Sequence, residues 1–239
     1  MDLSLRILIT GANRGIGLAL SRELASQGHT LVLCARHPAK ADELRELAGG
    51  SKGSVNIVAL DVDSDESVHQ AKQEVAAKLE ALDVLVNNAA VFPEEGNETL
   101  AEMDLRWFRE AFETNVLGMV RVTRAFAPLV EKGENPRIVN ISSLAGSIAQ
   151  KEDNGYYAYS ASKAALNMVT RAIAAEYKAR GICVVALSPG WVKTDMGGPN
   201  APLTPEESAR AIAKTLSALT MKKTGLFMER TGSVLQHAW

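Results

Sequence analysis

The sequence predicts an α/β protein: one doubly wound parallel sheet of about seven strands with helices on both faces. Three observations support this. Short apolar runs alternate with amphipathic stretches along the whole chain, and glycines or capping residues separate them. No linker, repeat or low-complexity tract divides the 239 residues. Strands that alternate with helices form parallel sheets, so we expect a single domain over residues 1–239.

The first half of the chain holds four expected strands. The run LRILIT is apolar and stops at Gly11, which is typical of a buried strand. Gly28 stands just past the first amphipathic stretch, where helices commonly end. Asp63 and Glu66 have capping-box spacing at the start of a third helix. The expected strands are 5–10, 29–34, 54–60 and 82–86, and the helices are 15–27, 39–47 and one that begins near 63.

The second half predicts two long helices and three further strands. Thr204, Pro205 and Glu207 mark another helix start, with a capping Thr, a Pro in the first turn and a Glu at the third position. A short strand after that helix closes the sheet. The expected elements are helices 104–130 and 156–179, strands 137–141, 182–187 and 226–228, and the helix that starts at 204.

Composition narrows the function classes. Lys plus Arg number 26 against 28 Asp plus Glu, which argues against nucleic acid as a partner. No stretch approaches the ~18 consecutive apolar residues of a membrane span. The start MDLSLRILIT has no secretory pattern, so we expect a cytoplasmic protein. Cys34 and Cys183 lie in apolar runs and are expected to be reduced and buried.

A glycine-rich turn follows the first strand. Gly11, Gly15 and Gly17 have GxxxGxG spacing, so the backbone can approach a pyrophosphate at the start of the next helix. A plain tight turn is the alternative. The second strand ends at Arg36 with no acid, and Arg14 lies in the turn. An acid there selects NAD, whereas an Arg accommodates the 2′-phosphate of NADP. We therefore expect NADP(H).

Tyr159 and Lys163 are four residues apart on an expected helix, hence on one face. A Lys ammonium at roughly 4 Å would lower the pKa of a phenol by up to ~3 units and make Tyr159 a proton carrier near neutral pH. Ser142 and Ser143 follow a central strand, where they either bind a carbonyl oxygen or simply cap the backbone.

Together these motifs resemble the short-chain dehydrogenase/reductases, over about the whole chain. The residues that carry the resemblance are TGANRGIG, Asn87-Asn88-Ala89-Ala90, Asn115, Ser143, Tyr159-x-x-x-Lys163 and Pro189-Gly190-x-Val192-x-Thr194. Within the family, residues 188–208 and Trp239 look like the Sniffer and C-factor branch of carbonyl reductase-like proteins.

The resemblance implies a Rossmann fold, NADP(H) as cofactor and hydride transfer to a small carbonyl substrate. Tyr159 is then the general acid or base, Ser143 polarises the substrate oxygen, and Lys163 holds the nicotinamide ribose. Asn115 keeps a water that relays protons to Lys163. The implied cofactor contacts are Gly11, Asn13, Arg14, Gly15, Ile16 and Gly17 in the turn, Arg36, Asp61 and Val62 at the adenosine, Asn88 and Ala89 at the ribose, and Pro189, Gly190, Val192 and Thr194 at the nicotinamide.

The resemblance also implies a homodimer or homotetramer formed through the two long helices. These carry apolar residues beyond one face, namely Phe108, Phe112, Val116, Val120, Leu166, Met168 and Val169.

Three segments bear on the substrate. The family usually has Gly where this chain has Ala90, so we expect a small local adjustment there. Ser143 and Tyr159 are farther apart than is usual, and the extra residues at 149–157 are expected to overhang the site. Residues 190–208 are the expected substrate-side loop.

Other functions find less support. The chain has no Gly-x-Ser-x-Gly elbow and no GxxxxGK[ST] loop, and its four histidines are scattered, so no metal is expected. Glu94 and Glu95 are expected to be solvated. A 3-oxoacyl thioester reductase would need a basic patch that Lys151, Glu152 and Asp153 do not supply. A regulatory NADP(H)-binding protein with little turnover is the alternative from another class.

Overall fold

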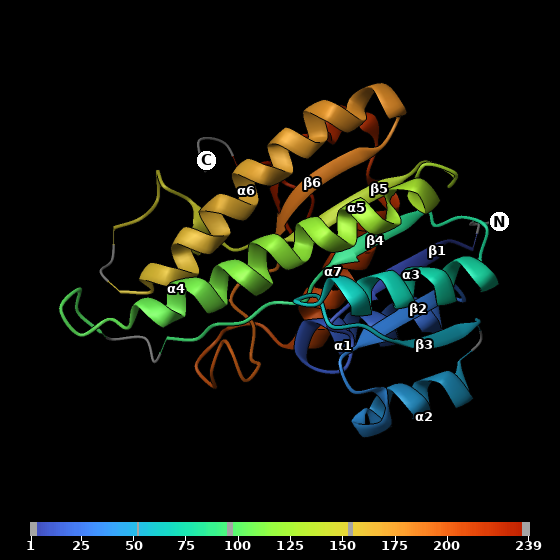
Figure 1. The fold of residues 1–239 in the computed structure, drawn as a ribbon, viewed down its shortest axis with the longest axis horizontal. Coiled ribbons are helices and arrows are strands. Elements are labelled where there is room, and N and C mark those ends of the chain that lie inside the picture. The colour runs from blue at the N-terminus through green and yellow to red at the C-terminus, as the bar shows by residue number, and fades with distance from the viewer. Residues whose placement is uncertain (1–3, 52, 95–97, 153–154, 236–239) are drawn as a thin grey trace.

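The computed structural model describes residues 4–51, 53–94, 98–152 and 155–235. Seven parallel strands form one sheet in the order β3-β2-β1-β4-β5-β6-β7, which confirms the predicted fold class (Figure 1). The chain starts in the middle of the sheet, builds one half outward and returns to build the other. The order therefore reverses between β1 and β4, which is where doubly wound sheets bind ligands at their carboxyl ends.

The strands lie within one or two residues of their expected positions. Both ends of a strand depend on hydrogen bonds to its neighbours, which the hydrophobic pattern does not encode. The observed strands are β1 Arg6–Thr10, β2 Thr30–Ala35, β3 Val55–Ala59, β4 Val84–Asn87, β5 Arg137–Ile141, β6 Cys183–Ser188 and β7 Phe227–Glu229.

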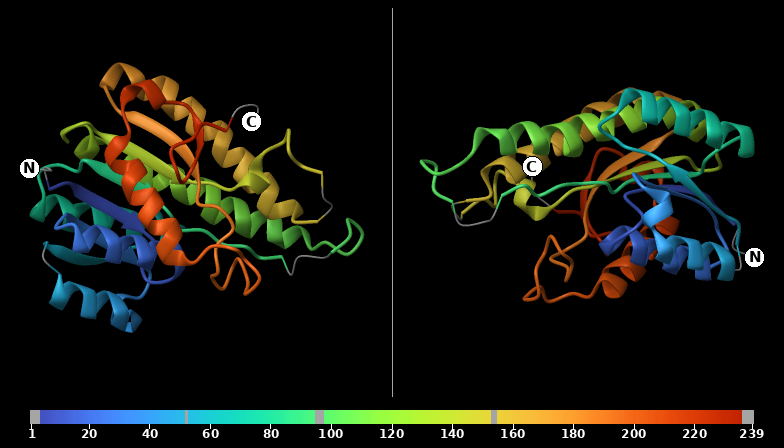
Figure 2. Two further views of the ribbon diagram at one scale, coloured as in Figure 1. Left: turned by 180° about the vertical axis from the view of Figure 1, so that it is seen from behind. Right: turned by 60° about the horizontal axis from the view of Figure 1, so that its bottom comes forward.

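Two helical layers cover the sheet, as the right-hand view of Figure 2 shows. Successive side chains of a strand point to opposite faces. Ile7 and Ile9 therefore pack in the core with the first and last long helices, whereas Leu8 packs in the core on the other face. One layer contains α1 Gly15–Ser26, α2 Asp42–Gly50 and α7 Pro205–Ala218, and the other contains α3 Asp65–Lys78, α4 Leu105–Phe112, α5 Met119–Val130 and α6 Tyr157–Tyr177.

The helix expected over residues 104–130 contains an interruption. Between α4 and α5 the backbone forms a π-helical segment, η2 Glu113–Gly118. π-Helical turns are rare and frequently mark functional sites. Here η2 carries Asn115, and Gly118 packs so closely on Val62 that a Cβ would lie 2.8 Å from a Val62 methyl group. The hydrophobic pattern of the sequence does not reveal this π-helical segment, because α-helix precedes it and follows it without a break.

One helix start was predicted wrongly and another correctly. The cap of α3 is Ser64, whose side chain accepts a hydrogen bond from Ser67 N–H. Asp63 is instead engaged by Thr114, whose hydroxyl donates to its carboxylate at 2.9 Å. Ser64 and Asp63 are both good capping residues, so local sequence could not choose between them. At α7, Thr204 and Glu207 form the predicted capping box.

The cysteines are as predicted. Cys34 and Cys183 are free thiols in the buried core, where burial raises the pKa of Cys183 to about 11 and raises that of Cys34 as well. Among the described residues, no group of three His, Cys, Asp or Glu side chains is placed to hold a metal ion. In the same part of the chain, no helix has the length and hydrophobicity to cross a membrane.

Candidate active site

The glycine turn packs against two other segments that the sequence assigned to the cofactor. A Cβ on Gly11 would lie 2.9 Å from Ala89 Cα, and one on Gly15 would lie 3.2 Å from the Thr194 methyl group. Gly11 and Gly15 also have positive φ angles of 63° and 53°. The turn, residues 88–89 and Thr194 therefore meet at one place, the carboxyl ends of β1 and β4.

The Asn88 side chain holds this glycine turn in place through hydrogen bonds. Its carboxamide donates to the carbonyl oxygens of Thr10 and Gly11 at 2.9 and 3.0 Å, and the Thr10 hydroxyl accepts from the N–H groups of Asn88 and Ala89. The Asn88 side chain thus fixes the turn, and the expected ribose contact is left to the backbone of this segment. Ala90 has no positive φ, so the Ala at this position fits an ordinary backbone conformation.

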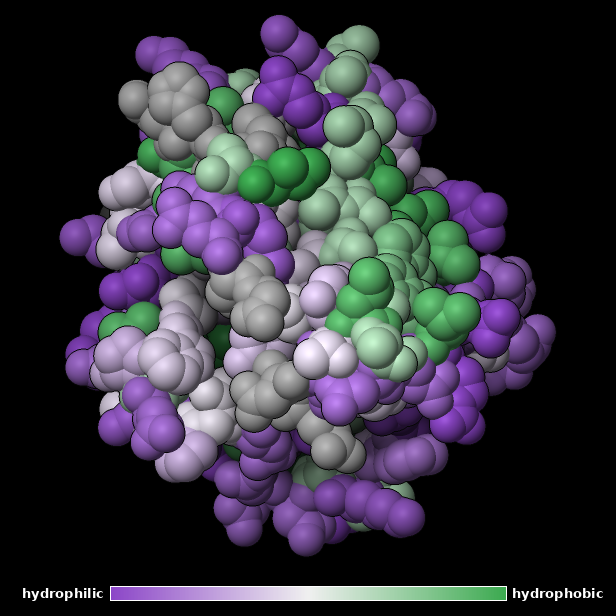
Figure 3. Space-filling view, turned by 90° about the vertical axis from the view of Figure 1, so that its left-hand side faces the viewer, coloured by the Kyte–Doolittle hydropathy of each residue, from purple (hydrophilic) through white to green (hydrophobic). Residues whose placement is uncertain are grey.

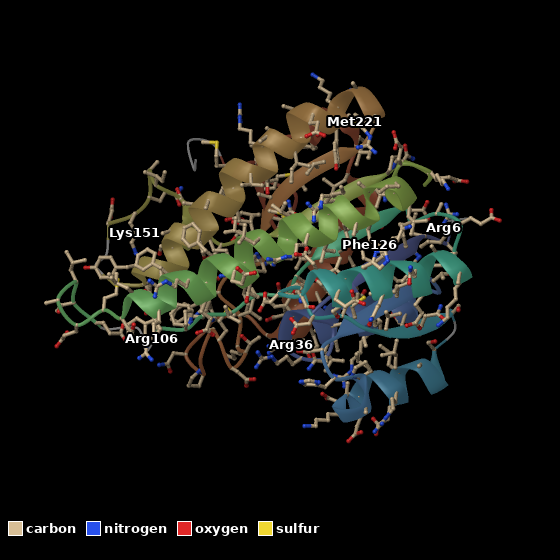
Figure 4. The ribbon with its side chains drawn as sticks, viewed as in Figure 1. Arg6, Arg36, Arg106, Phe126, Lys151 and Met221 are labelled. Carbon is tan, nitrogen blue, oxygen red and sulfur yellow. The ribbon has the colours of Figure 1, made fainter. Side chains whose placement is uncertain are left out.

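The first turn of α1 presents unpaired donors. Its cap residue, Arg14, makes no side-chain capping bond, and the first intrahelical bond comes from Leu18 N–H. Free N–H groups at a helix start bind phosphates. Arg14 in this turn is exposed and contacts Asp195 at 3.4 Å. Arg36, just after β2, is also exposed (Figure 4). Asn13 and Ile16 lie in the same turn and are half-buried.

The remaining residues that the sequence assigned to the cofactor also lie at this edge. Asp61 follows β3, and its carboxylate accepts from Asp63 N–H, while Val62 is buried against η2. Pro189 and Gly190 follow β6, and Gly190 has a φ of 83°. Val192 is buried and pairs with Leu203 across the substrate-side loop.

Tyr159 lies in the first turn of α6, next to Ser143. The Ser143 side chain is close enough to the Tyr159 hydroxyl to lower its pKa, and the Ser143 hydroxyl accepts from Ala145 N–H at 3.1 Å. Burial raises the pKa of Tyr159 to about 12, and the Ser143 side chain only partly opposes this rise. The lowering of this pKa that the sequence predicted is therefore absent from the structure, because burial of the phenol raises the pKa by more than the Ser143 side chain lowers it.

Lys163 is one helical turn farther along and is 2% exposed. Its ammonium donates to the Ile141 carbonyl oxygen at 2.9 Å and lies 5.7 Å from the centre of the Tyr159 ring. Burial lowers the pKa of Lys163 to about 8, so the group is mainly charged at neutral pH. A buried cation without a carboxylate partner is unusual in structural cores and typical of functional sites.

Asn115 ties three elements together. Its carboxamide accepts from Val91 N–H at 2.8 Å, donates to the Val91 carbonyl at 3.0 Å and donates to the Ser162 hydroxyl at 2.9 Å. Ser162 precedes Lys163 on α6, so Asn115 reaches the catalytic helix through this neighbour. Asn115 is 1% exposed and lies within η2, the π-helical segment between α4 and α5.

Two motif residues are structural. The Ser142 hydroxyl donates to Asn167 inside the core, so of the two serines only Ser143 faces Tyr159. Asn87 donates to Thr123 and Asn140, which joins β4 to β5.

Glu94 is the main residue that sequence analysis missed. It was expected to be solvated, but it is 5% exposed, and its carboxylate accepts from the N–H groups of Ala158 and Tyr159 at 2.9 and 2.7 Å. Phe92, two residues earlier, meets the Tyr159 ring edge-on with centroids 4.9 Å apart. No local pattern identifies these contacts, because Glu94 sits in a loop rich in acids. Glu95 lies outside the described residues, as do Asp153 and Trp239.

A cavity of about 260 Å³ opens at the carboxyl ends of β5, β6 and β7. Its lining includes Leu144, the residue after Ser143, and four residues of the expected substrate-side loop. The lining residues are Leu144, Ser188, Gly190, Trp191, Pro202, Leu203, Glu229 and Arg230.

Comparison with known proteins agrees with this geometry. Residues 6–202 match the short chain dehydrogenase family, and the chain belongs to that family. An uncharacterized oxidoreductase of Schizosaccharomyces pombe is 37% identical over 95% of this chain and 96% of its own. The C-signal protein of Myxococcus xanthus is 39% identical over 64% of this chain and 90% of its own.

Solved structures of carbonyl reductases superpose closely. The carbonyl reductase Sniffer of Drosophila melanogaster has a TM-score of 0.92 and 32% identity, covering 99% of this chain and 100% of its own. The NADPH-bound carbonyl reductase from chicken fatty liver has a TM-score of 0.91 and 35% identity with the same coverage. The resemblance that the motifs predicted is thereby confirmed, including its Sniffer and C-signal relatives.

Proposed function

We propose that the chain is an NADPH-dependent carbonyl reductase that acts on a small or medium ketone, aldehyde or quinone. The observation that carries the proposal is the group formed by Tyr159, Ser143 and Lys163, two hydroxyls and a buried cation, beside a glycine turn suited to a dinucleotide. The NADPH-bound chicken carbonyl reductase, which has the same fold, supports it.

Each residue has a distinct part in the proposed reaction. NADPH, when bound, supplies the hydride that goes to the carbonyl carbon. Ser143 donates a hydrogen bond to the carbonyl oxygen, and Tyr159 gives that oxygen its proton. A phenol with a raised pKa is fully protonated at neutral pH, as an acid must be. The Lys163 ammonium then stabilises the phenolate that remains, and Asn115 belongs to the proton path that restores the phenol.

The described residues fit the phosphorylated cofactor. The turn has the close glycine packing and the free N–H groups that a pyrophosphate needs. Arg36 and Arg14 are exposed cations at the same edge, and β2 ends without an acid that would bind a ribose 2′-hydroxyl. We therefore assign NADP(H), with Arg36 and Arg14 at the 2′-phosphate.

The cavity that Leu144, the neighbour of Ser143 in sequence, helps to line is the proposed substrate site. It is mixed in character, with Trp191 and Leu144 as apolar walls and Glu229 and Arg230 as charged ones. Residues 190–208 form one side of it, in keeping with a substrate-side loop. The protein is proposed to work in the cytoplasm.

The proposal is tested by NADPH oxidation against a panel of quinones, aldehydes, diketones and ketones, with NADH in parallel. We expect turnover of at least one panel member and a preference for NADPH. Binding of NADPH without turnover of any panel member would leave two interpretations, a substrate outside the panel or a regulatory protein, and the likeness to C-signal favours the second. A thioester reductase is disfavoured, because the Lys151 ammonium donates to Gly155 and Ser160 at the start of α6.

We also propose a homodimer or homotetramer that forms through α4, η2, α5 and α6. Leu117 and Met168 on these helices are 47% and 68% exposed. Figure 3, which faces the end of the molecule where α4 and α6 begin, shows a band of hydrophobic residues on a largely polar surface. Leu166 and Val116, which the sequence also offered for the interface, are buried within the chain. Light scattering of the purified protein measures its molar mass and so distinguishes a monomer, a dimer and a tetramer.

A further inference from the structure

We propose that Glu94 is a positioning residue that holds Tyr159 in place for proton transfer by anchoring the first turn of α6. The inference rests on the proposed function, since it concerns the same Tyr159. It adds a residue from the loop after β4, outside the motifs that define the site.

The first turn of α6 has no cap from its own sequence. The N–H groups at a helix start lack intrahelical partners, and the first intrahelical bond of α6 runs from Ser160 N–H to the Tyr156 carbonyl. Tyr156 stands at the cap position with a φ of 51° and makes no side-chain capping bond. The N–H groups of Ala158 and Tyr159 therefore depend on a partner from elsewhere in the chain.

Glu94 is that partner. Each of its carboxylate oxygens accepts one of the two N–H groups, at 2.9 and 2.7 Å, and the side chain is almost fully buried. Bonds to an ionised acceptor are about twice as strong as neutral ones, and a negative charge is favoured at a helix start. One of the two donors is the N–H of Tyr159 itself. Glu94 thus fixes the backbone of the residue that transfers the proton.

Glu94 is also the last residue of a segment, residues 91–94, in which Val91 and Phe92 are held by contacts of their own. Asn115 holds Val91 through both its N–H and its carbonyl group, and the Phe92 ring packs edge-on against Tyr159. Residues 88–89, immediately before this segment, pack on the glycine turn. A continuous set of contacts therefore links the cofactor turn to the helix that carries Tyr159.

The effect of losing Glu94 is local. Tyr159 is the third residue of α6, whereas Lys163 lies one turn deeper and is held separately by the Ile141 carbonyl. Removal of the anchor loosens the first turn and leaves the ammonium and the glycine turn in place. A displacement of a reacting group by about 1 Å lowers a rate by about 10²-fold. The expected result is a fall in kcat with NADPH binding retained.

The variants Glu94→Ala and Glu94→Gln test this. Gln keeps the size of the side chain and one acceptor oxygen, so it also guards against a variant that fails to fold. Asp104→Ala is the matched control, because Asp104 caps α4 with a carboxylate and lies outside the site. For Glu94→Ala we expect kcat to fall about 10- to 100-fold. The fall should be smaller in Glu94→Gln and absent in Asp104→Ala, with the NADPH dissociation constant unchanged in all three.

Two further measurements separate positioning from mere loss of structure. The deuterium isotope effect on kcat with 4-deuterated NADPH should rise in Glu94→Ala, because the chemical step becomes slower; a smaller folded fraction would leave it unchanged. Hydrogen exchange should accelerate at the amides of Ala158 and Tyr159 in Glu94→Ala, less in Glu94→Gln, and not in Asp104→Ala. Unchanged exchange, or faster exchange with unchanged kcat, overturns the inference. A wild-type protein without turnover contradicts the proposed function, and the exchange rates then decide the anchoring by themselves.

Discussion

Buried charged side chains lie at both ends of the sheet, and they differ in the groups that pair with them. At the amino end, Asp83 precedes β4 and accepts four hydrogen bonds, three from Arg6 and one from Glu134 N–H. At the carboxyl end, the Lys163 ammonium is equally buried but has a carbonyl oxygen in place of a carboxylate. Figure 4 shows Arg6 at one end of the molecule and Lys151, beside the start of α6, at the other.

The pKa values reflect this difference. Burial alone would raise the pKa of Asp83, but the hydrogen bonds from Arg6 and Glu134 outweigh it and the pKa is lowered. At Lys163 and Tyr159 burial dominates, and each pKa moves toward the neutral form of its group. A paired charge stabilises the fold, whereas an under-compensated one is held at a cost and is available for chemistry. The following variants test that contrast.

Tyr159→Phe should have the largest effect. Removal of the hydroxyl takes away the proton donor, so turnover should fall about 10²–10⁴-fold. Because the ring remains, packing against Phe92 is kept and NADPH should still bind. The measurement is steady-state turnover with fluorescence titration of NADPH. Tyr157→Phe, the same change two residues away on α6, is the control, and unchanged turnover of Tyr159→Phe would contradict the assigned role.

Asp83→Asn should disturb stability and spare activity. The variant leaves Arg6 without its charged partner, and we expect the free energy of unfolding to fall by about 2–3 kcal/mol. Thermal unfolding should then begin about 5–10 °C lower, with kcat per folded molecule unchanged. The control is Glu43→Gln, which breaks an exposed pair with Arg22 and should change stability by less than about 0.5 kcal/mol. A fall in kcat in Asp83→Asn would contradict the view that the charge at the amino end of the sheet serves stability alone.

The two ends should also respond to pH in different windows, Lys163 in the alkaline range and Asp83 in the acid range. The unfolded Lys163 binds its proton up to about pH 10.4, but the folded one releases it at about 8. The folded state binds fewer protons in this window, so the contribution of Lys163 to stability rises from pH 8 to 10.4, by about 3 kcal/mol. Asp83 has a lowered pKa, so its contribution is lost as pH falls below about 4.

Urea unfolding of the wild type and of Lys163→Met measures this. The two buried thiols have raised pKa values and oppose the lysine in the alkaline window, but they are common to both proteins. The free energy of unfolding of the wild type minus that of Lys163→Met should therefore increase as pH rises. A difference that stays constant from pH 7.5 to about 10.4 would show that Lys163 is not perturbed by burial.

Arg36→Asp should have the smallest effect. One charge-assisted bond to the 2′-phosphate contributes about 1.5–3 kcal/mol, so the preference for NADPH over NADH should fall about 10- to 100-fold. Arg106→Asp, an equal change of charge at the start of α4 and away from the cofactor edge, is the control (Figure 4). Titration with NADPH and with NADH measures the ratio of the two dissociation constants. An unaltered ratio would show that Arg36 does not bind the 2′-phosphate.

The sequence by itself determined the fold class, and it predicted the place of the candidate site and the proximity of Tyr159 and Lys163. These depend on local regularities: the alternation of apolar runs, glycines after a strand, and a spacing of four on a helix. The same regularities placed almost every strand within two residues. They failed at α3, where two capping residues stand side by side, and at η2, whose π-helical hydrogen bonds leave no mark in the hydrophobic pattern.

Only the tertiary structure decided the environment of the site. Glu94 meets α6 across 65 residues of chain, and Asp83 meets Arg6 across 77, so no local pattern records either contact. Burial likewise belongs to the assembled core and reverses the pKa shift that spacing alone suggested for Tyr159. A sequence specifies which groups can react, whereas desolvation and long-range hydrogen bonds, which exist only after folding, set their protonation and hold them in place.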